Sequence, residues 1–422
     1  MQCQAVRSEF TQRLADEQPR LVETAQRLIR TPSENPPGDT AAIAAVAGEL
    51  LSGVDGAEVA LVPSTDPIVN VVARIKGGGP GRRLIFNGHL DTFPAGESAL
   101  WSDDPFAGKA ADGRIGGRGA SDMKGGLACS ILAFAMLAEI RDAWAGELVV
   151  TLAGDEETMG VLGTQYLLDT VPHATGDAMI CADAGSPMVV RFGEKGLIWL
   201  EVTAEGRAAH GAHVHLGENA VERLMGALGA LVTLCDLPVA TPPEVADAIA
   251  QAADVSQTIS GAGETRVLQA LTVNIGTFDG GISPNLVPDR ARAGVDIRLP
   301  IGVTVAEVEA AIARLLDPLA GVAYRIERRY EPNWTDPDHE IVRLAVKNGQ
   351  EILGTAPVVN MRVGASDSRL YRRAGIPSIV YGLTPHNLGG GDEYATLDDL
   401  FAVFHVMAMT AFDFLSPPGD GD

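Results

Sequence analysis

Apolar residues along the first 190 positions alternate between helical spacing and short continuous runs. Phe10, Leu14 and Leu21 recur at helical intervals and predict a surface helix over residues 6–30. The same pattern predicts further helices at 40–51, 126–140 and 160–169, and strands at 69–75, 83–86, 147–153 and 177–181. Because strands alternate with helices, we expect an α/β sheet with helices on both faces.

The pattern changes near residue 191. Residues 197–204 alternate as a strand with one exposed face, and the stretch at 251–265 is polar enough to predict an exposed loop. The other predicted elements are a helix at 218–235, strands at 271–276 and 291–299, a helix at 305–316 and a strand at 324–329. This strand–helix–strand–strand–helix–strand order is ferredoxin-like.

Helix–strand alternation resumes after residue 330, with a strand at 378–381 and a helix that begins at Leu397. The ferredoxin-like segment is therefore predicted to be inserted into the first domain. The predicted division is 1–191 and 330–422 for a catalytic domain and 192–329 for the inserted one. A chain of 422 residues is also too long for one ordinary core.

Composition narrows the class of protein. With 46% hydrophobic and 21% charged residues, the chain is expected to be globular and soluble. A net charge of −23 argues against a nucleic-acid partner, which needs a basic face. The four cysteines show no CxxC spacing, and neither a secretory apolar region nor an apolar run of transmembrane length is evident. We therefore expect a cytoplasmic protein without a disulfide framework or a membrane partner.

Candidate chemistry begins where the predicted strand near residue 86 ends. His89 and Asp91 follow that strand, and Asp122 lies in a glycine-rich loop just before a predicted helix. Such nitrogen and oxygen donors are typical zinc ligands, and the Asp91 carboxylate is expected to hold the far ring nitrogen of His89.

Acidic residues and a second histidine follow three more predicted strands. Asp155, Glu156 and Glu157 come after one strand, and adjacent acids there form either a solvated turn or a metal and base cluster. Asp183 and His386 each follow another strand. Several strand ends that each carry a His, Asp or Glu favour the metal cluster.

The longest motifs are GHLDTFP, WSDDPFAGKAADGRIGGRGASDMKGG, AGDEETMG, GRAAHGA, SPNLVPDRARAGVDIRLP and DEY. On these motifs the chain resembles the dinuclear-metal hydrolases that include acetylornithine deacetylase, succinyl-diaminopimelate desuccinylase, carboxypeptidase G and the aminoacylases. The resemblance extends from the N-terminal helix to Leu400. It implies a metallopeptidase-like mixed sheet between helices, with a ferredoxin-like lid and dimerisation domain.

The resemblance also implies five metal ligands, which are His89, Asp122, Glu157, Asp183 and His386. Asp122 would bridge two divalent ions, with His89 and Asp183 on one and Glu157 and His386 on the other. Zinc is expected first, with manganese or cobalt as alternatives. Asp183 stands where many relatives carry Glu, and the glycine-rich segment 387–391 is longer than usual.

Two catalytic residues are implied by the same resemblance. Glu156 would be the general base that takes a proton from a metal-bridging water, and His210 would stabilise the oxyanion in the active site of a homodimer partner. The alternative for His210 is an ordinary loop histidine. His213 and His215 receive no assigned role.

Expected substrate contacts are Asn285, Arg298, Gly364 and Ser366, with Asp367 and Arg369 as weaker candidates. Arg298 would pair with a substrate carboxylate, although an exposed strand arginine is the alternative. The acids Asp103, Asp104, Asp112, Asp392 and Glu393 are expected on the ordinary surface, with the DEY run ordering its loop through hydrogen bonds.

The leading functional hypothesis is hydrolysis of a C–N bond in an N-acyl amino acid or dipeptide-like molecule with a free carboxylate. The alternative is hydrolytic deamination of an electron-poor aromatic amine such as 5-nitroanthranilate, because the chain also resembles a nitroanthranilate aminohydrolase of this family. A catalytically silent ligand-binding relative is disfavoured, because Glu156 and all five implied ligands are present.

Overall fold

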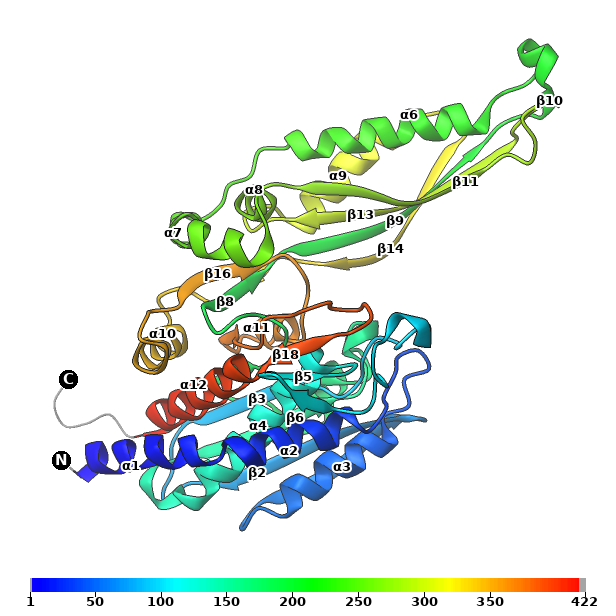
Figure 1. The fold of residues 1–422 in the computed structure, drawn as a ribbon. Coiled ribbons are helices and arrows are strands. Elements are labelled where there is room, and N and C mark those ends of the chain that lie inside the picture. Colours follow the sequence, from blue (N-terminus) through cyan, green and yellow to red (C-terminus); the bar gives the residue numbers. More distant parts are fainter. Residues whose placement is uncertain (1, 417–422) are drawn as a thin grey trace.

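The computed structural model describes residues 2–416 and is built around two main sheets, one above the other in Figure 1. The larger sheet has nine strands in the order β1-β2-β6-β3-β7-β17-β8-β15, and β16 pairs with β8. Its strands are β1 Glu58–Thr65, β2 Ile68–Lys76, β3 Arg83–His89, β6 Glu147–Ala153, β7 Ala178–Cys181, β8 Val189–Glu194, β15 Asn333–Trp334, β16 Val358–Arg362 and β17 Ser378–Val380. Strands β6, β3, β7 and β17 run parallel, whereas β1, β2 and β15 pair antiparallel. This is the predicted mixed sheet.

Helices cover both faces of this sheet. They are α1 Gln2–Asp16, α2 Gln18–Ile29, α3 Ala41–Ser52, α4 Gly125–Glu139, α5 Thr164–Thr170, α10 Glu340–Leu353, α11 Ser368–Arg373 and α12 Leu397–Leu415. Helices α4 and α12 pack against each other and on β3, while α5 and α11 pack on β6 and β7. The parallel strands are buried along almost their whole length, as expected of a sheet covered on both sides.

The single helix predicted over residues 6–30 is wrong, because the chain forms α1 and α2 with a break at Glu17. Pro19 lies in the first turn of α2. Proline lacks an N–H donor and clashes with the preceding turn, so it starts a new helix here.

The stretch Ala120–Glu139 has the length and hydropathy of a membrane span, contrary to the expectation that no apolar run is long enough. However, 94% of its apolar window is buried inside the molecule. It contains α4, which lies in the main hydrophobic core. A buried core helix accounts for this composition.

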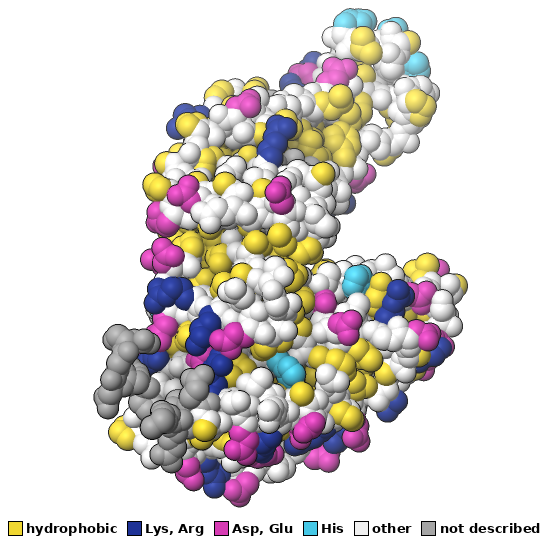
Figure 2. Space-filling view, turned by 60° about the vertical axis from the view of Figure 1, so that its left-hand side comes forward, with side chains coloured by type: hydrophobic (Ala, Val, Ile, Leu, Met, Phe, Trp, Pro, Cys, Tyr) yellow, Lys and Arg dark blue, Asp and Glu magenta, His cyan; other side chains and the backbone are white. Residues whose placement is uncertain are grey.

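The smaller sheet has the antiparallel order β11-β13-β9-β14. It consists of β9 Gly196–Glu205, β11 Thr272–Gly280, β13 Arg290–Leu299 and β14 Val322–Tyr330, with α6 Ala220–Val232 and α9 Val305–Leu316 packed on it. These elements enclose a second hydrophobic core and have the predicted ferredoxin-like order. Figure 2 shows a wide hollow between this unit and the main body.

Two short sheets complete the fold. One pairs β10 Ala209–His210 with β12 Leu286–Val287 at the far tip of the smaller unit. The other has the order β18-β5-β4, from β4 Lys109–Ala111, β5 Arg114–Gly116 and β18 Tyr394–Thr396. This second sheet joins the loop before α4 to the segment that follows His386.

The exposed loop predicted at 251–265 is wrong. The region forms α7 Pro243–Ser260 and α8 Glu264–Gln269. Val245, Ile249 and Ala252 recur at helical spacing and are buried, and α7 packs against β16 of the larger sheet. The polar and glycine residues after 251 hid this periodicity. Val245 and Ile249 lie within the predicted inserted domain, but they belong to the core of the larger sheet. The domain boundaries at 191 and 329 therefore stay a prediction.

Candidate functional site

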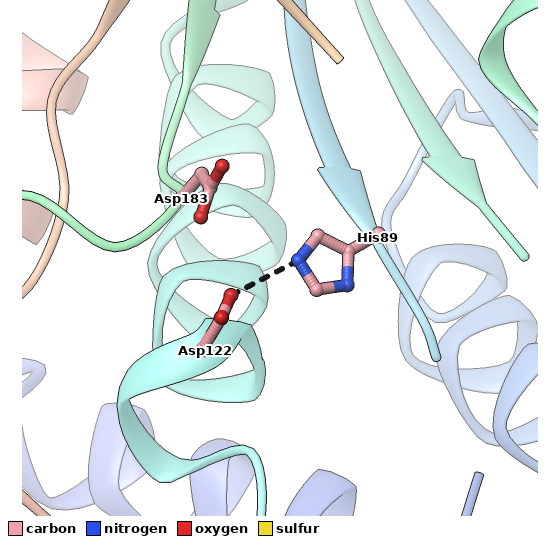
Figure 3. Close-up of side chains that lie close together, drawn as sticks. All are labelled: His89, Asp122 and Asp183. Carbon is pink, nitrogen blue, oxygen red and sulfur yellow. Dashed lines mark hydrogen bonds and ion pairs between the residues drawn. The ribbon is translucent and has the colours of Figure 1, made fainter. Parts of the chain in front are cut away.

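Three predicted ligands meet at the carboxyl edge of the parallel strands. His89 ends β3, Asp183 follows β7, and Asp122 precedes α4 (Figure 3). The Nε2 atom of His89 lies 3.1 Å from Oδ1 of Asp122, and one ligand atom from each residue lies within 4.8 Å of the other two. His89 and Asp183 are buried and Asp122 is partly buried.

These donors fit a divalent ion. One imidazole nitrogen and carboxylate oxygens that converge in a buried pocket suit zinc or manganese. Burial raises the pKa of Asp183 to about 6 and that of Glu157 to about 8, in each case with the Asp122 carboxylate adding to the rise. Oε1 of Glu157 is also buried without a hydrogen-bond partner among the described residues. Buried acids with raised pKa values and an unpartnered oxygen are expected where a bound cation supplies the missing positive charge.

Two further predicted ligands lie outside this three-residue group. Glu157 follows β6, and its carboxyl is close enough to His89 to be stabilised by the imidazole charge. His386 is half-buried and stacks on Tyr394 with ring centroids 4.4 Å apart. Their roles as ligands of a second ion stay predictions.

The role predicted for the Asp91 carboxylate is wrong in its detail. Nδ1 of His89 donates to the main-chain carbonyl of Asp91 at 2.8 Å, whereas the carboxylate is 3.7 Å away. The carboxylate instead accepts the backbone N–H groups of Glu156 and Glu157, each at 3.1 Å, and the side-chain amide of Asn35. A carbonyl only accepts, so Nδ1 carries a proton, and Nε2 is the nitrogen that faces the cluster and Asp122. Asp91 thus fixes both the imidazole and the loop that carries Glu156.

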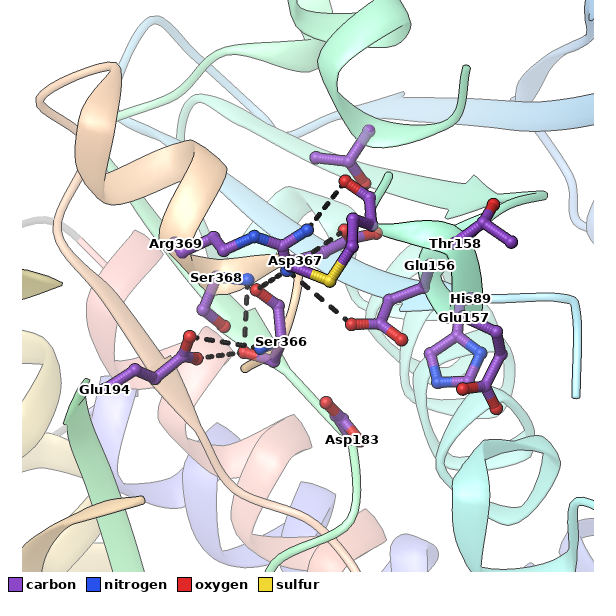
Figure 4. A network of polar contacts seen from close by, with 12 residues as sticks. His89, Glu156, Glu157, Thr158, Asp183, Glu194, Ser366, Asp367, Ser368 and Arg369 are labelled. Atoms are coloured by element: carbon purple, nitrogen blue, oxygen red, sulfur yellow. Dashed lines mark hydrogen bonds and ion pairs between the residues drawn. The ribbon is translucent and has the colours of Figure 1, made fainter. Parts of the chain in front are cut away.

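The Glu156 carboxyl is 12% exposed and lies 3.6 Å from Nη1 of Arg369 (Figure 4). Burial raises the pKa of Glu156 well above its usual value, although the charges of His89 and Arg369 oppose the rise. Arg369 is itself 2% exposed and donates to the carbonyls of Ser366 and Met159. The fixed guanidinium of Arg369 therefore orients the carboxyl of Glu156.

The substrate contact predicted for Ser366 is not supported by this geometry. Ser366 is fully buried, and both its backbone N–H and its hydroxyl donate to Glu194. A buried hydroxyl needs a partner, and Glu194 supplies it. Asp367 is also buried and accepts the Thr164 hydroxyl at 2.7 Å, whereas Gly364 is partly exposed.

The smaller unit carries the other predicted residues. His210 is exposed at its tip (β10 in Figure 1), and its Nδ1 accepts the backbone N–H of Ala212 at 3.1 Å. This bond leaves the ring proton on Nε2, so His210 is fixed as a hydrogen-bond donor. Asn285 is exposed beside it, and the main-chain carbonyl of Asn285 accepts the backbone N–H of Gly211. Arg298 pairs with Asp296 at 2.9 Å, and the structure places none of the three in the metal cluster.

Glu393, expected on the ordinary surface, is 1% exposed. One of its oxygens pairs with buried Arg118, and the other accepts the backbone N–H groups of Ser121 and Asp122 at 3.0 and 3.3 Å. The pair holds the loop that presents Asp122. Because the two residues are 275 positions apart, only the place of Glu393 just before a short strand hinted at this role.

Comparison with known proteins agrees with this geometry. Residues 85–413 match Peptidase family M20/M25/M40. The chain belongs to this family. It is 33% identical to a succinyl-diaminopimelate desuccinylase from Methylobacterium sp. (strain 4-46), over 94% of this chain and 97% of that protein. A desuccinylase from Rhodospirillum centenum is 29% identical over 90% and 93% of the two chains.

Solved structures share the fold. Human carnosine dipeptidase 1 superposes with a TM-score of 0.77 at 18% identity, covering 97% of this chain and 99% of that one. A metallo-carboxypeptidase from Sulfolobus solfataricus gives 0.76 at 20% identity, covering 93% and 98%. The predicted family and mixed α/β fold are therefore confirmed, and the chain is a metal-dependent hydrolase that acts on C–N bonds.

Replacing Glu393 tests the support of the Asp122 loop. Glu393→Gln should destabilise the protein by about 3–5 kcal/mol, because Arg118 would remain buried without a counter-ion. The neighbour Asp392 accepts the backbone N–H and the hydroxyl of Ser102, but this contact is exposed and neutralises no buried charge, so Asp392→Asn should change stability by less than about 1 kcal/mol. Thermal unfolding of both variants measures the difference. Equal midpoints for Glu393→Gln and the wild type would refute this role.

Proposed function

We propose that this protein hydrolyses the amide C–N bond of an N-acyl amino acid or a dipeptide-like molecule that has a free carboxylate. The observation that carries the proposal is the position of Glu156. Its carboxyl lies at the edge that holds His89, Asp122 and Asp183, but it is not one of the three converging ligands. A carboxylate beside a metal site, and not bound to it, is free to move a proton.

Two divalent ions, zinc foremost and manganese or cobalt otherwise, would be held by His89, Asp122, Glu157, Asp183 and His386. When bound, such ions lower the pKa of a water molecule and polarise the scissile carbonyl. The family membership and the converging His and Asp donors support a metal centre here. A Bacillus subtilis protein of similar fold, with a TM-score of 0.64, is described as a dinuclear metal binding peptidase.

Glu156 would act as the general base. Its raised pKa, caused by burial, makes the ionised carboxylate a stronger base than an exposed one. Arg369, 3.6 Å away, favours the ionised form and holds the side chain in place. Glu156 would accept a proton from the attacking water and then deliver it to the leaving nitrogen.

His210 would donate its Nε2 proton to the oxyanion in the site of a partner subunit. It belongs to β10 at the tip of the smaller unit, whereas β3 and α4, which lie next to its own metal cluster, belong to the main body (Figure 1). Exposed apolar side chains on β11 and α6 support a homodimer through this lid: Met225, Val232, Ile275 and Phe278 are each more than 40% exposed. Asn285, paired with the same turn, would enter the partner's site together with His210.

The substrate is proposed to be a small carboxylate in the cytoplasm. The desuccinylases that the chain resembles support an acyl amino acid. Deamination of 5-nitroanthranilate stays the alternative and differs in releasing ammonia without an acyl group. No observation on the site favours it over amide hydrolysis.

Replacing the base tests the proposal directly. Glu156→Gln should lower turnover by about 10²–10⁴-fold, because a neutral amide does not accept the proton. The assay is amine and ammonia release from N-succinyl and N-acetyl amino acids, dipeptides and 5-nitroanthranilate. Metal content, measured by plasma mass spectrometry, should be unchanged in this variant. Turnover equal to that of the wild type at equal metal content would reject Glu156 as the base.

Mixed dimers test the shared site. His210→Ala and Glu156→Gln should each be nearly inactive, but mixing them should restore roughly one quarter of wild-type activity, since half the dimers then contain one complete site. His213→Ala, a neighbouring exposed histidine, is the control and should remain active. No recovery, with subunit exchange verified by mass spectrometry, would contradict catalysis across the dimer.

A further inference from the structure

Glu194 is a fully buried glutamate at the point where the chain leaves the larger sheet. It is the last residue of β8, and β9 of the smaller unit begins at Gly196. The backbone of Glu194 pairs with Asn333 of β15 and with Arg362 of β16. The next residue, Lys195, donates to two main-chain carbonyls at the end of α8. The backbone that carries the Glu194 side chain is therefore firmly held.

The carboxylate of Glu194 has two kinds of partner. It accepts the backbone N–H of Ser366 at 3.0 Å and also the Ser366 hydroxyl, and Nη1 of Arg372 lies 3.4 Å away. Arg372 also donates to the Asn333 side chain and to the Ser378 carbonyl. A counter-ion for a buried arginine does not need to accept both donors of a serine. The contacts with Ser366 therefore add a second role, which is to fix the loop that carries this serine.

Ser366 is connected to the base through one side chain. Nη1 of Arg369 donates to the Ser366 carbonyl at 2.5 Å, and the same nitrogen lies 3.6 Å from Oε1 of Glu156. Figure 4 shows these contacts as a continuous chain from Glu194 to Glu156. A long arginine side chain has many rotamers and needs fixed acceptors to stay in one of them. The position of the guanidinium beside the base thus depends on where Ser366 lies.

Arg369 also holds the far end of the turn that carries the base. Its Nη2 donates to the carbonyl of Met159 at 2.7 Å. Met159 has a φ of 84°, a left-handed conformation that residues with a side chain rarely adopt. Such a turn needs support from its surroundings, and Arg369 supplies part of it. A displaced guanidinium would release both ends of the turn formed by residues 156–159.

We propose that Glu194 is a positioning residue of the hydrolytic reaction. By holding Ser366, it keeps the guanidinium of Arg369 against the carboxyl of the general base. This inference rests on the proposed function, because it requires Glu156 to be that base. A displacement of about 1 Å in a catalytic group can lower the rate about 10²-fold. Since Glu194 is fully buried and does not touch the substrate, its loss should lower kcat and leave KM nearly unchanged.

Two substitutions separate positioning from charge compensation. Glu194→Ala removes both acceptors of Ser366, whereas Glu194→Gln keeps an acceptor for its N–H and a polar group beside its hydroxyl. Neither variant neutralises buried Arg372, so both should unfold at a lower temperature than the wild type.

The amine-release assay with N-succinyl and N-acetyl amino acids, on zinc-loaded protein, then gives kcat and KM. Glu194→Ala should lower kcat at least about tenfold with KM changed less than about threefold, and Glu194→Gln should restore most of the kcat. Wild-type kcat in Glu194→Ala, or equal losses in the two variants, would overturn the proposal.

Ser366→Ala is a milder variant. It removes one donor to Glu194 and leaves the ion pair with Arg372 intact, so the buried charge stays compensated. This variant should lower kcat at least about threefold, whether or not Glu194→Ala folds. An unchanged kcat in Ser366→Ala would contradict the positioning role.

Glu264 provides a matched control. It is buried, accepts the hydroxyl of Ser256 and lies 3.4 Å from Arg191, but none of these residues lies on the path from Glu194 to the base. Glu264→Ala should also lower the unfolding temperature, yet keep kcat within about twofold of the wild type. A loss of kcat equal to that of Glu194→Ala would mean that turnover merely follows stability, and the proposal would fail.

The crystal structure of Glu194→Ala gives a readout that does not depend on turnover. The guanidinium of Arg369 should be displaced from the Glu156 carboxyl, and an unmoved guanidinium would refute the proposal. In the Glu156→Gln background, Glu194→Ala should cause no further loss of kcat, because the base is already absent, and a further tenfold loss would also refute it. If Arg369 moves while Glu156→Gln retains wild-type turnover, the proposed base is wrong and the link from Glu194 to Arg369 stands.

Discussion

Repulsion among buried carboxylates is the constraint on which this site depends. Asp122, Asp183, Glu156 and Glu157 gather at one edge of the larger sheet with the imidazole of His89 among them. Burial raises the pKa values of Asp183, Glu156 and Glu157, so negative charge at this edge has to be offset by cations. Nearby arginine side chains supply part of this positive charge.

Three arginines distribute positive charge around the acids. Arg118 neutralises Glu393 beneath the Asp122 loop, Arg369 faces Glu156, and Arg362 pairs with Asp183. The first two are buried and held by carbonyl partners, whereas the side chain of the third is 17% exposed. The negative charge that these arginines do not offset is left for the metal ions.

Much of this arrangement was predictable from sequence because parallel strands end at a common edge. His89 and Asp183 come at the ends of predicted strands, and Asp122 comes just before a predicted helix. These positions were enough to expect the three residues together. The ferredoxin-like order of the smaller sheet was predictable for a different reason. Its strands alternate between buried and exposed residues, and this pattern is local in the sequence. Helix α7 was missed because its buried face meets β16, a strand about 100 residues later.

Two of the remaining errors concern partners that lie far apart in the chain. The Ser366–Glu194 contact and the Arg118–Glu393 pair depend on backbone paths that residue spacing does not encode. His89 and Asp91 are close in sequence, and the error there concerns the carbonyl that is used in place of the carboxylate. A motif identifies residues that share a site, but not which atom of each residue is used. The pairing of Arg298 with Asp296 was not expected for this reason.

Metal stoichiometry tests the central claim most directly. Protein purified without added metal, and the same protein after incubation with zinc or manganese and dialysis, is analysed by plasma mass spectrometry for the wild type and Glu157→Ala. Two bound ions per chain in the wild type and fewer in the variant are expected if the buried acids hold a dinuclear centre. No bound metal before or after incubation would contradict the account, because the cluster would then not be a metal site.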